Sequence, residues 1–201
     1  MEFNPEELDQ KAIYKLITGA IIPRPIGWIS TISEEGIPNL APFSFFNVIG
    51  DDPPHVMFST AHGNQHKKDT LNNALATGQF VVNMVTEEIV EAMNATAQSV
   101  HSDIDEFELA GLTPMPSVKI KPPRVKESPI TFECEVVHHY SLENHKYGGA
   151  TMVVGRIVMF HFAEAVLLED HKINLDVYRP VSRLAGANYS KLGELFAVKR
   201  G

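Results

Sequence analysis

The sequence predicts a mainly β fold with a few helices (β+α), forming a closed antiparallel barrel in a single domain over residues 1–201. Short runs rich in β-branched and aromatic residues recur along the chain, as expected for strands. Residues 130–140 alternate apolar side chains with Thr and Glu, which is typical of a strand with one buried face. The helical segments are too few for alternating βαβ units, so a barrel with helices as crossovers and caps is favoured.

Capping residues and apolar periodicity locate the helices. The first is expected to begin after Asn4, with Pro5 in its first turn, and to end at Gly19. Gly78 closes the second helix, and Thr86 is the expected N-cap of the third. The expected helices cover residues 5–18, 65–76, 87–97, a short segment from 103, and 188–196.

The remaining elements are strands and connectors. Strands are expected at 26–32, 55–60 and 80–85, at 130–140, and in the run TMVVGRIVMFHF. The turn DDPP at 51–54 leads into the second of these strands. The proline-rich segment 114–123 is interpreted as a loop within the domain, not as a domain boundary.

Composition excludes several classes of partner and location. A formal net charge of −8 opposes binding to nucleic acid or to anionic lipid. No window approaches 18 consecutive apolar residues, and the acidic N-terminus does not resemble a secretory signal. The single cysteine, Cys134, excludes an internal disulfide and fits a small core residue in a reducing compartment, so a cytoplasmic location is expected.

Residues 23–70 carry most of the candidate chemistry. Arg24 lies between two prolines and could face a phosphate, or it could be an ordinary surface arginine at a helix-to-strand junction. Trp28 is the only tryptophan, and core packing is the alternative to a binding role for it. Ser30 and Thr31 offer two hydroxyls for a phosphate or a polyhydroxylated chain of a ligand.

The segment from Asn39 to Asn47 is too apolar for a solvated loop and too rich in Pro, Ser and Asn for a plain buried strand. Backbone groups combined with aromatic side chains suit a flat heteroaromatic ring that has a polar edge. An aromatic-rich core strand remains the alternative. The candidate contacts are Ala41, Pro42, Phe43, Ser44, Phe45, Phe46 and Asn47.

A phosphate site is expected where the next strand gives way to a helix. Ser59 and Thr60 end the strand, and Lys68, Asp69 and Thr70 follow at the helix start. Hydroxyls, a lysine and free N–H groups at a helix N-terminus together favour an anion. A solvated helix end with a charged first turn is the alternative.

These pieces in this order resemble the flavin reductase-like family of FMN-binding split barrels. The similarity rests on PRPIGWIST, APFSFFN and KDT, and the later PVSRLAGANY resembles the flavoredoxin-like branch and the small components of two-component monooxygenases. The resemblance implies a six-stranded antiparallel split β-barrel with Greek-key topology. It also implies that Arg183 pairs with a phosphate or with a carboxylate on a neighbouring subunit, and that Tyr189 covers the flavin, with capping and core packing as alternatives for both.

The resemblance further implies non-covalent FMN and hydride transfer from NAD(P)H, with no side chain acting as acid or base. A homodimer with FMN near the subunit interface is implied as well, with a monooxygenase or another electron acceptor as partner. Many relatives place a histidine where this chain has Ala150, with His145 nearby, so a flavin-binding electron carrier is the second hypothesis. A metal-dependent β-barrel enzyme using His62 and His66 is the third, although no metal site is expected.

Overall fold

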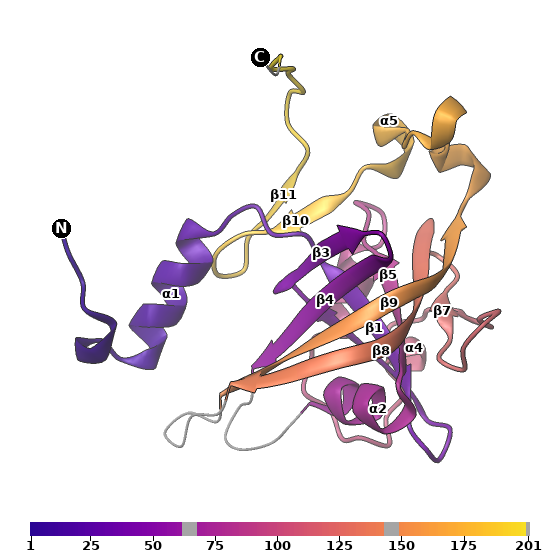
Figure 1. Ribbon diagram of the computed structural model, residues 1–201, viewed down its shortest axis with the longest axis horizontal. Coiled ribbons are helices and arrows are strands. Elements are labelled where there is room, and N and C mark those ends of the chain that lie inside the picture. Colours follow the sequence, from indigo (N-terminus) through magenta and orange to yellow (C-terminus); the bar gives the residue numbers. More distant parts are fainter. Residues whose placement is uncertain (62–67, 143–148, 200–201) are drawn as a thin grey trace.

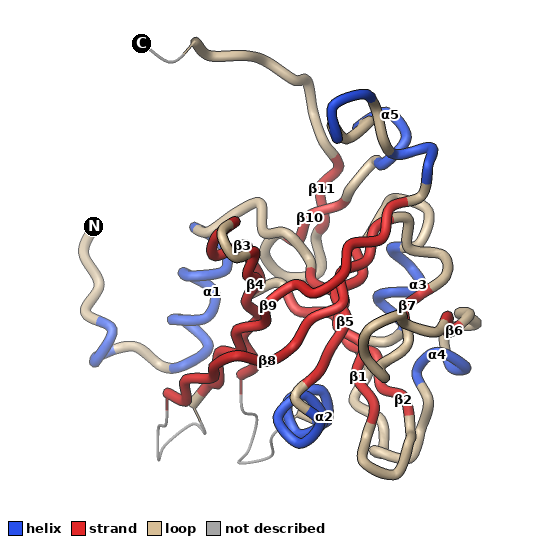
Figure 2. The backbone as a smooth tube through the Cα atoms, turned by 45° about the vertical axis from the view of Figure 1, so that its right-hand side comes forward, coloured by secondary structure: helices blue, strands red, loops and turns tan. Residues whose placement is uncertain are grey.

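The main sheet of the computed structural model contains seven antiparallel strands in the order β2-β1-β5-β8-β9-β4-β3 (Figures 1 and 2). The structure describes residues 1–61, 68–142 and 149–199. The strands are β1 (Gly27–Ile32), β2 (Pro38–Phe43), β3 (Phe46–Asp51), β4 (Pro54–Ala61), β5 (Gln79–Met84), β8 (Ile130–Leu142) and β9 (Ala150–Phe162). This arrangement confirms the mainly β, antiparallel class.

The two edge strands of this sheet, β2 and β3, are consecutive in the chain. Only Ser44 and Phe45 separate them, so the ends of the two edges lie within a few residues' reach of each other. The sheet must therefore curl until its edges meet at this bend, where the chain and not a ladder of hydrogen bonds joins them. The predicted number of six strands is too low by one, because the segment 39–47 divides into β2 and β3 around the bend.

The interior of the curled sheet is packed with aromatic rings. Phe58, which is fully buried, contacts Phe43 and Phe80 with ring centroids 5.2 and 5.1 Å apart. Gly155 on β9 makes room for Phe80, since a Cβ there would lie 2.3 Å from the ring tip. Cys134 is buried in the same cluster, as expected for a core residue, and burial raises the pKa of its thiol.

The N-terminal segment forms two helices instead of the single one predicted. Asn4 caps a 3-10 turn, η1 (Pro5–Glu7), and Asp9 caps α1 (Gln10–Ala20) by accepting a hydrogen bond from the Ala12 N–H. The prediction missed Asp9 as a second cap, and Gly19 lies inside α1 and does not end it. Helix α1 stands away from the body of the sheet (Figure 1).

The other helices are shorter than predicted. Helix α2 (Asp69–Thr77) ends at Gly78 in the left-handed conformation, as expected, but begins after Lys68. Its predicted start at residues 65–67 lies outside the described residues. Helix α3 (Val90–Ala95) begins after Ile89 and not after Thr86, and α4 (Glu106–Leu109) is capped by Asp105.

The proline-rich connector 114–123 is held as a loop within the fold. Strands β6 (Pro114–Met115) and β7 (Arg124–Val125) pair across it. The buried carboxylate of Glu133 accepts hydrogen bonds of 2.7 Å from the Val118 and Lys119 N–H groups. Clean alternation predicted an exposed Glu133, but the loop covers it completely.

The C-terminal region is extended where a helix over 188–196 was predicted. It contains β10 (Val181–Arg183) paired with β11 (Tyr189–Lys191), and the residues after β11 run outward as an arm (Figure 1). Two 3-10 turns, η2 (Glu164–Val166) and η3 (Glu169–His171), and α5 (Leu175–Tyr178) precede it. No helix among the described residues has the length and apolar character needed to span a membrane.

Candidate functional site

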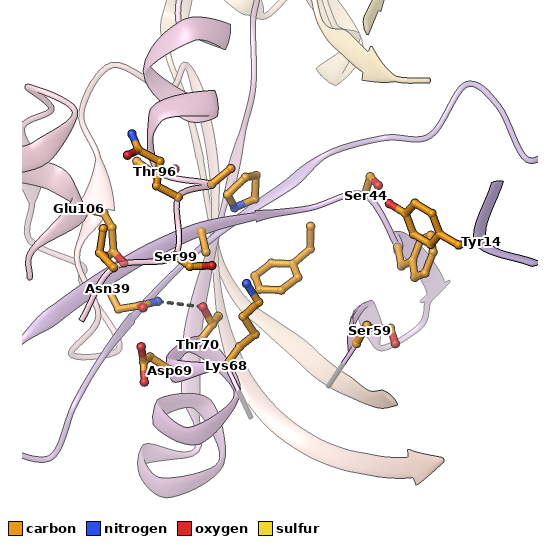
Figure 3. Close-up of a pocket in the computed structure, with 18 residues that line it drawn as sticks. Tyr14, Asn39, Ser44, Ser59, Lys68, Asp69, Thr70, Thr96, Ser99 and Glu106 are labelled. Atoms are coloured by element: carbon orange, nitrogen blue, oxygen red, sulfur yellow. Dashed lines mark hydrogen bonds between the residues drawn. The ribbon is translucent and has the colours of Figure 1, made fainter. Parts of the chain in front are cut away.

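A pocket of about 510 Å³ opens beside β2, near the bend that joins the two sheet edges (Figure 3). Helix α2, the loop after α3 and the start of α4 supply its other walls. Its lining consists of Tyr14, Asn39, Ala41, Pro42, Phe43, Ser44, Phe45, Ser59, Ala61, Lys68, Asp69, Thr70, Thr96, Ala97, Gln98, Ser99, Val100 and Glu106.

The backbone of β2 borders this pocket as an edge strand. Within the sheet β2 pairs only with β1, so alternate backbone groups point away from the ladder. The Leu40 N–H is one of these, because it donates over 3.0 Å to Glu106 Oε2 instead of to a strand. An edge of this kind, followed by the bend at Ser44 and Phe45, offers backbone donors and acceptors to a planar ligand.

One end of the pocket has the features of an anion site. Helix α2 begins there, and its first N–H groups have no acceptor within the helix. Lys68 at the N-cap is exposed, and no ion pair involves it among the described residues. The Thr70 hydroxyl is buried and accepts a hydrogen bond of 2.9 Å from Asn39 Nδ2, which ties the helix to β2 (Figure 3).

Glu106 lies at the same end of the pocket, almost completely buried. Burial raises the pKa of its carboxyl, the hydrogen bond from the Leu40 N–H opposes this, and the nearby carboxylates of Asp105 and Asp69 raise it further. Charges of both signs thus meet at this end. Lys68 and the N–H groups of α2 would attract a phosphate, and Asp69 would repel it.

The opposite end of the pocket is aromatic and hydroxylic. Tyr14 and Ser44 lie together there, away from Asp69, Thr70 and Glu106 (Figure 3). Phe43 and Phe45 also line the pocket, and Phe45 is 37% exposed. This end suits a flat ring, whereas the α2 end suits an anion.

A second, smaller hollow of about 200 Å³ adjoins the aromatic end. It shares Tyr14, Pro42, Ser44 and Ala97 with the pocket. Its other lining residues are Ile26, Met93, Asn94, Arg183 and Tyr189. The predicted residues Arg183 and Tyr189 thus lie together beside the pocket and not in it.

The structure brings nine of the predicted residues to the pocket itself. They come from three separate stretches of the chain: Ala41, Pro42, Phe43, Ser44, Phe45, Ser59, Lys68, Asp69 and Thr70. Seven others line neither hollow: Arg24, Trp28, Ser30, Thr31, Phe46, Asn47 and Thr60.

Arg24 is hydrogen-bonded within the fold and lines neither hollow. Its guanidinium donates to the backbone oxygens of Thr18, Ile21 and Leu184 at 2.7, 2.7 and 3.0 Å. Its Nε donates to the Ser44 hydroxyl at 3.2 Å, and only 6% of the residue is exposed. Arg24 therefore holds α1, the bend and the C-terminal hairpin together.

The side chains predicted on β1 are buried. Trp28 is fully buried and donates from Nε1 to Thr96 Oγ1 at 2.9 Å, so packing is its role. Ser30 donates to the Pro123 carbonyl, and Thr31 accepts hydrogen bonds from the Asn39 and Asn73 side chains. None of these side chains is open to a ligand, because each has 0% exposure.

Three further predicted side chains also point elsewhere. Phe46 packs against Gly27, where a Cβ would lie 2.5 Å from the ring. Asn47 is exposed, and its side chain accepts from the Val48 N–H. Thr60 faces the interior, and its buried hydroxyl has no hydrogen-bond partner among the described residues.

Some lining residues were not predicted from the sequence. Tyr14 reaches the pocket from α1, which Arg24 links to the bend through the Thr18 carbonyl and the Ser44 hydroxyl. The segment 96–100 forms a wall between α3 and α4. Asn39 marks the start of the predicted segment, but its contact with Thr70 connects residues far apart in sequence. A buried glutamate such as Glu106 has no local sequence signature.

The described residues were compared with the predicted metal alternative. No group of three or more His, Cys, Asp or Glu side chains there is arranged to hold a metal ion. His62 and His66, and also His145, lie outside the described residues.

A family model described as the flavin reductase like domain matches residues 19–176. The chain belongs to the flavin reductase like family. An uncharacterised protein of Aquifex aeolicus is 42% identical over 192 residues, covering 95% of each chain. A second one, from Bacillus subtilis, is 40% identical over 200 residues, covering 98% of each.

Several solved structures resemble the chain closely. Nitrilotriacetate monooxygenase component B from Bacillus cereus is 40% identical, with a TM-score of 0.95 and 98% of each chain covered. The 2-nitrobenzoate 2-nitroreductase of Pseudomonas fluorescens is 34% identical, with a TM-score of 0.88 over 100% of this chain and 96% of that one. Flavoredoxin of Desulfovibrio vulgaris, at 21% identity and a TM-score of 0.74 over 89% and 91%, shares the fold. A protein of Shewanella frigidimarina with a split barrel domain, at 24% identity and a TM-score of 0.85 over 100% of each chain, shares the fold, which agrees with the predicted split barrel.

Proposed function

We propose that this protein binds FMN non-covalently in the pocket beside β2 and transfers hydride to it from NAD(P)H. The observation that carries the proposal is the polarity of that pocket. A helix N-terminus with an exposed lysine lies at one end, and aromatic side chains with an edge-strand backbone lie at the other. FMN has the same polarity, with a phosphate at one end and a flat ring at the other.

The residues present fit this group. The volume of about 510 Å³ lies within the range of ~300–1,000 Å³ that is usual for small-molecule sites. Lys68 and the first N–H groups of α2 would hold the phosphate, with the Thr70 hydroxyl beneath them. The backbone from Ala41 to Phe45 would border the ring, and Tyr14 would lie at its far end.

FMN, when bound, supplies the redox chemistry, and the protein supplies position and electrostatics. The edge of β2 offers backbone groups in fixed register, because Gly27 to Ile32 of β1 pair with every residue of β2. Glu106 and Thr70, which line the pocket at its α2 end, are almost completely buried.

A homodimer with FMN close to the subunit interface is part of the proposal. Helix α1, which carries Tyr14 to the pocket, exposes Leu16 and Ile17 at 46% and 45%, and Ile21, which follows it, is 61% exposed. Phe196 on the C-terminal arm is 87% exposed. A second subunit packed on these apolar side chains would remove them from water and cover the pocket.

The 40% identical relative from Bacillus cereus is named as one component of a monooxygenase. We therefore propose a monooxygenase, or another electron acceptor, as the partner that uses the reduced flavin. The cytoplasm is the proposed location, since one buried cysteine fits a reducing compartment.

Ala150 favours a second candidate function, an electron-carrying flavoprotein that does not use NAD(P)H. Ala150 begins β9 and pairs with Ala61, which lines the pocket, so this position borders the site. The family histidine expected here is missing, and with it one contact for a nicotinamide.

Anaerobic absorption spectra separate the two candidates. The purified protein is mixed with FMN, then NADH or NADPH, and finally dithionite. Bleaching of the flavin band by the nicotinamide supports hydride transfer. A bound flavin that stays oxidised until dithionite is added supports the electron carrier. Failure to bind FMN at all contradicts both.

A further inference from the structure

Arg24 and Arg183 pair through their backbones in an isolated antiparallel bridge. Their guanidinium groups have different partners. Arg24 is 6% exposed and donates to three carbonyl oxygens and one hydroxyl. Arg183 donates only to the Gly186 carbonyl and forms no ion pair among the described residues. Arg183 therefore retains donors that are free to bind an anion.

The hollow in front of Arg183 is chemically suited to an anion on a small ring. Among the described residues that line it, Arg183 is the one with a charge, and none carries a carboxylate. The guanidinium carbon lies 4.6 Å above the Tyr189 ring, and the Tyr189 hydroxyl donates to Asn94 Oδ1 at 3.1 Å. Stacking and this hydrogen bond fix the orientation of both side chains. Ile26, Met93 and Pro42 supply apolar walls.

The second hollow lies next to the pocket in which the flavin is proposed to bind. It shares Tyr14, Pro42, Ser44 and Ala97 with the larger pocket, and Tyr14 and Ser44 mark the aromatic end of that pocket. Lys68 and Thr70 do not line it. A flavin whose phosphate is held by Lys68 would extend its ring toward this shared wall. A molecule in the hollow would then lie beside the ring and not beside the phosphate.

We propose that the second hollow binds the small molecule that exchanges electrons with the flavin, and that Arg183 anchors it through a carboxylate or phosphate group. This inference rests on the proposed function, and it assigns Arg183 to the reaction partner instead of the cofactor. A volume of about 200 Å³ is below the usual range for whole drug-sized ligands, so the hollow takes a single substituted ring or one portion of a larger donor.

The test uses benzoate, phenyl phosphate and neutral benzamide as probes. Each is titrated by calorimetry into the full-length protein, flavin-free and FMN-loaded, and the flavin absorption band is followed in the loaded form. Benzoate or phenyl phosphate should bind at least ten-fold more tightly than benzamide, and the better of the two identifies the anionic group. Arg183→Gln should remove this preference, and Arg183→Lys should restore part of it, because charge-assisted hydrogen bonds are the strong ones.

Arg156→Gln is the matched control. It removes the same charge from an exposed arginine on β9 that is paired with Glu135 at 2.8 Å, outside the hollow. Its probe affinities should equal those of the unmodified protein. Circular dichroism of each variant checks the fold.

Two results would overturn the inference. One is equal binding of benzoate, phenyl phosphate and benzamide, and the other is an anion preference that survives Arg183→Gln. FMN affinity is measured on the same samples and should change less than two-fold in Arg183→Gln. Intact FMN binding without an anion preference contradicts this inference alone, whereas absent FMN binding contradicts the proposed function.

Discussion

The side-chain nitrogen of Asn39 lies 2.9 Å from Thr70 Oγ1 and joins the edge strand β2 to the first turn of α2. The same nitrogen lies 3.2 Å from Thr31 Oγ1 on β1. One buried amide thus fixes the helix N-terminus against two strands, at the end of the pocket assigned to the phosphate.

Replacing Asn39 with Ala should lower stability by about 1–3 kcal/mol, because two buried hydroxyls lose a donor. It should also weaken FMN binding several-fold, because the N-terminus of α2 is no longer held against β2. Urea unfolding and FMN titration measure the two effects. Asn47→Ala removes an exposed asparagine from β3, the next strand in the chain, and should leave both stability and FMN affinity nearly unchanged. An Asn39→Ala protein with unchanged stability would contradict this role.

Gly155→Ala should destabilise the barrel by roughly 1–3 kcal/mol, the usual cost of overpacking a core. The new Cβ would lie 2.3 Å from Phe80 Cζ, in a site where Phe80 is fully buried and cannot move aside freely. Combining it with Phe80→Leu should recover part of the loss, as a double-mutant cycle in urea would reveal. Strictly additive losses would contradict the steric explanation.

The buried carboxylate of Glu133 should make the protein less stable at low pH. Burial alone would raise the pKa of its carboxyl, but hydrogen bonds from the Val118 and Lys119 N–H groups and from His161 outweigh burial and lower the pKa. A folded-state pKa below the ordinary value of 4.5 adds stability above that pH, and this contribution is lost as the pH falls through the folded value.

Glu133→Gln should therefore cost about 1–3 kcal/mol at pH 7, and the difference from the unmodified protein should shrink below about pH 4.5. Urea unfolding at pH 7 and at lower pH values measures it. Glu135→Gln is the control, because Glu135 is 44% exposed and its pair with Arg156 lies at the surface. A loss at pH 7 that persists unchanged in acid would mean that Glu133 acts through shape and not through its charge.

Local sequence signals predicted the strands and the ends of some elements well. Alternation located β8, and the left-handed Gly78 ends α2 as expected. Helix lengths were overestimated where an extended chain is held by tertiary contacts. The segment 188–196 is the clearest case, because Tyr189 pairs with Arg183 and donates to Asn94 in preference to forming a helix.

The pocket was predicted only in part, for a similar reason. Nine of its lining residues belong to motifs that are continuous in the chain, so their order could be interpreted directly. Arg24, Trp28 and Thr31 belong to the same motifs, but their partners are distant: a carbonyl at 184, a hydroxyl at 96 and an amide at 39. Sequence alone does not tell whether a polar side chain in a motif faces a ligand or another part of the fold.

The central claim is that the pocket binds FMN with its phosphate at Lys68 and the N-terminus of α2. The most direct test compares the dissociation constants of FMN and riboflavin for the unmodified protein and for Lys68→Ala. Lys172→Ala is the charge-matched control, because Lys172 is exposed and distant in sequence from Lys68. Lys68→Ala should weaken FMN binding about ten-fold or more and leave riboflavin nearly unchanged, since charged hydrogen bonds contribute about 1.5–3 kcal/mol. Lys172→Ala should alter neither. Equal losses for FMN and riboflavin in Lys68→Ala, or no loss for FMN, would contradict the account.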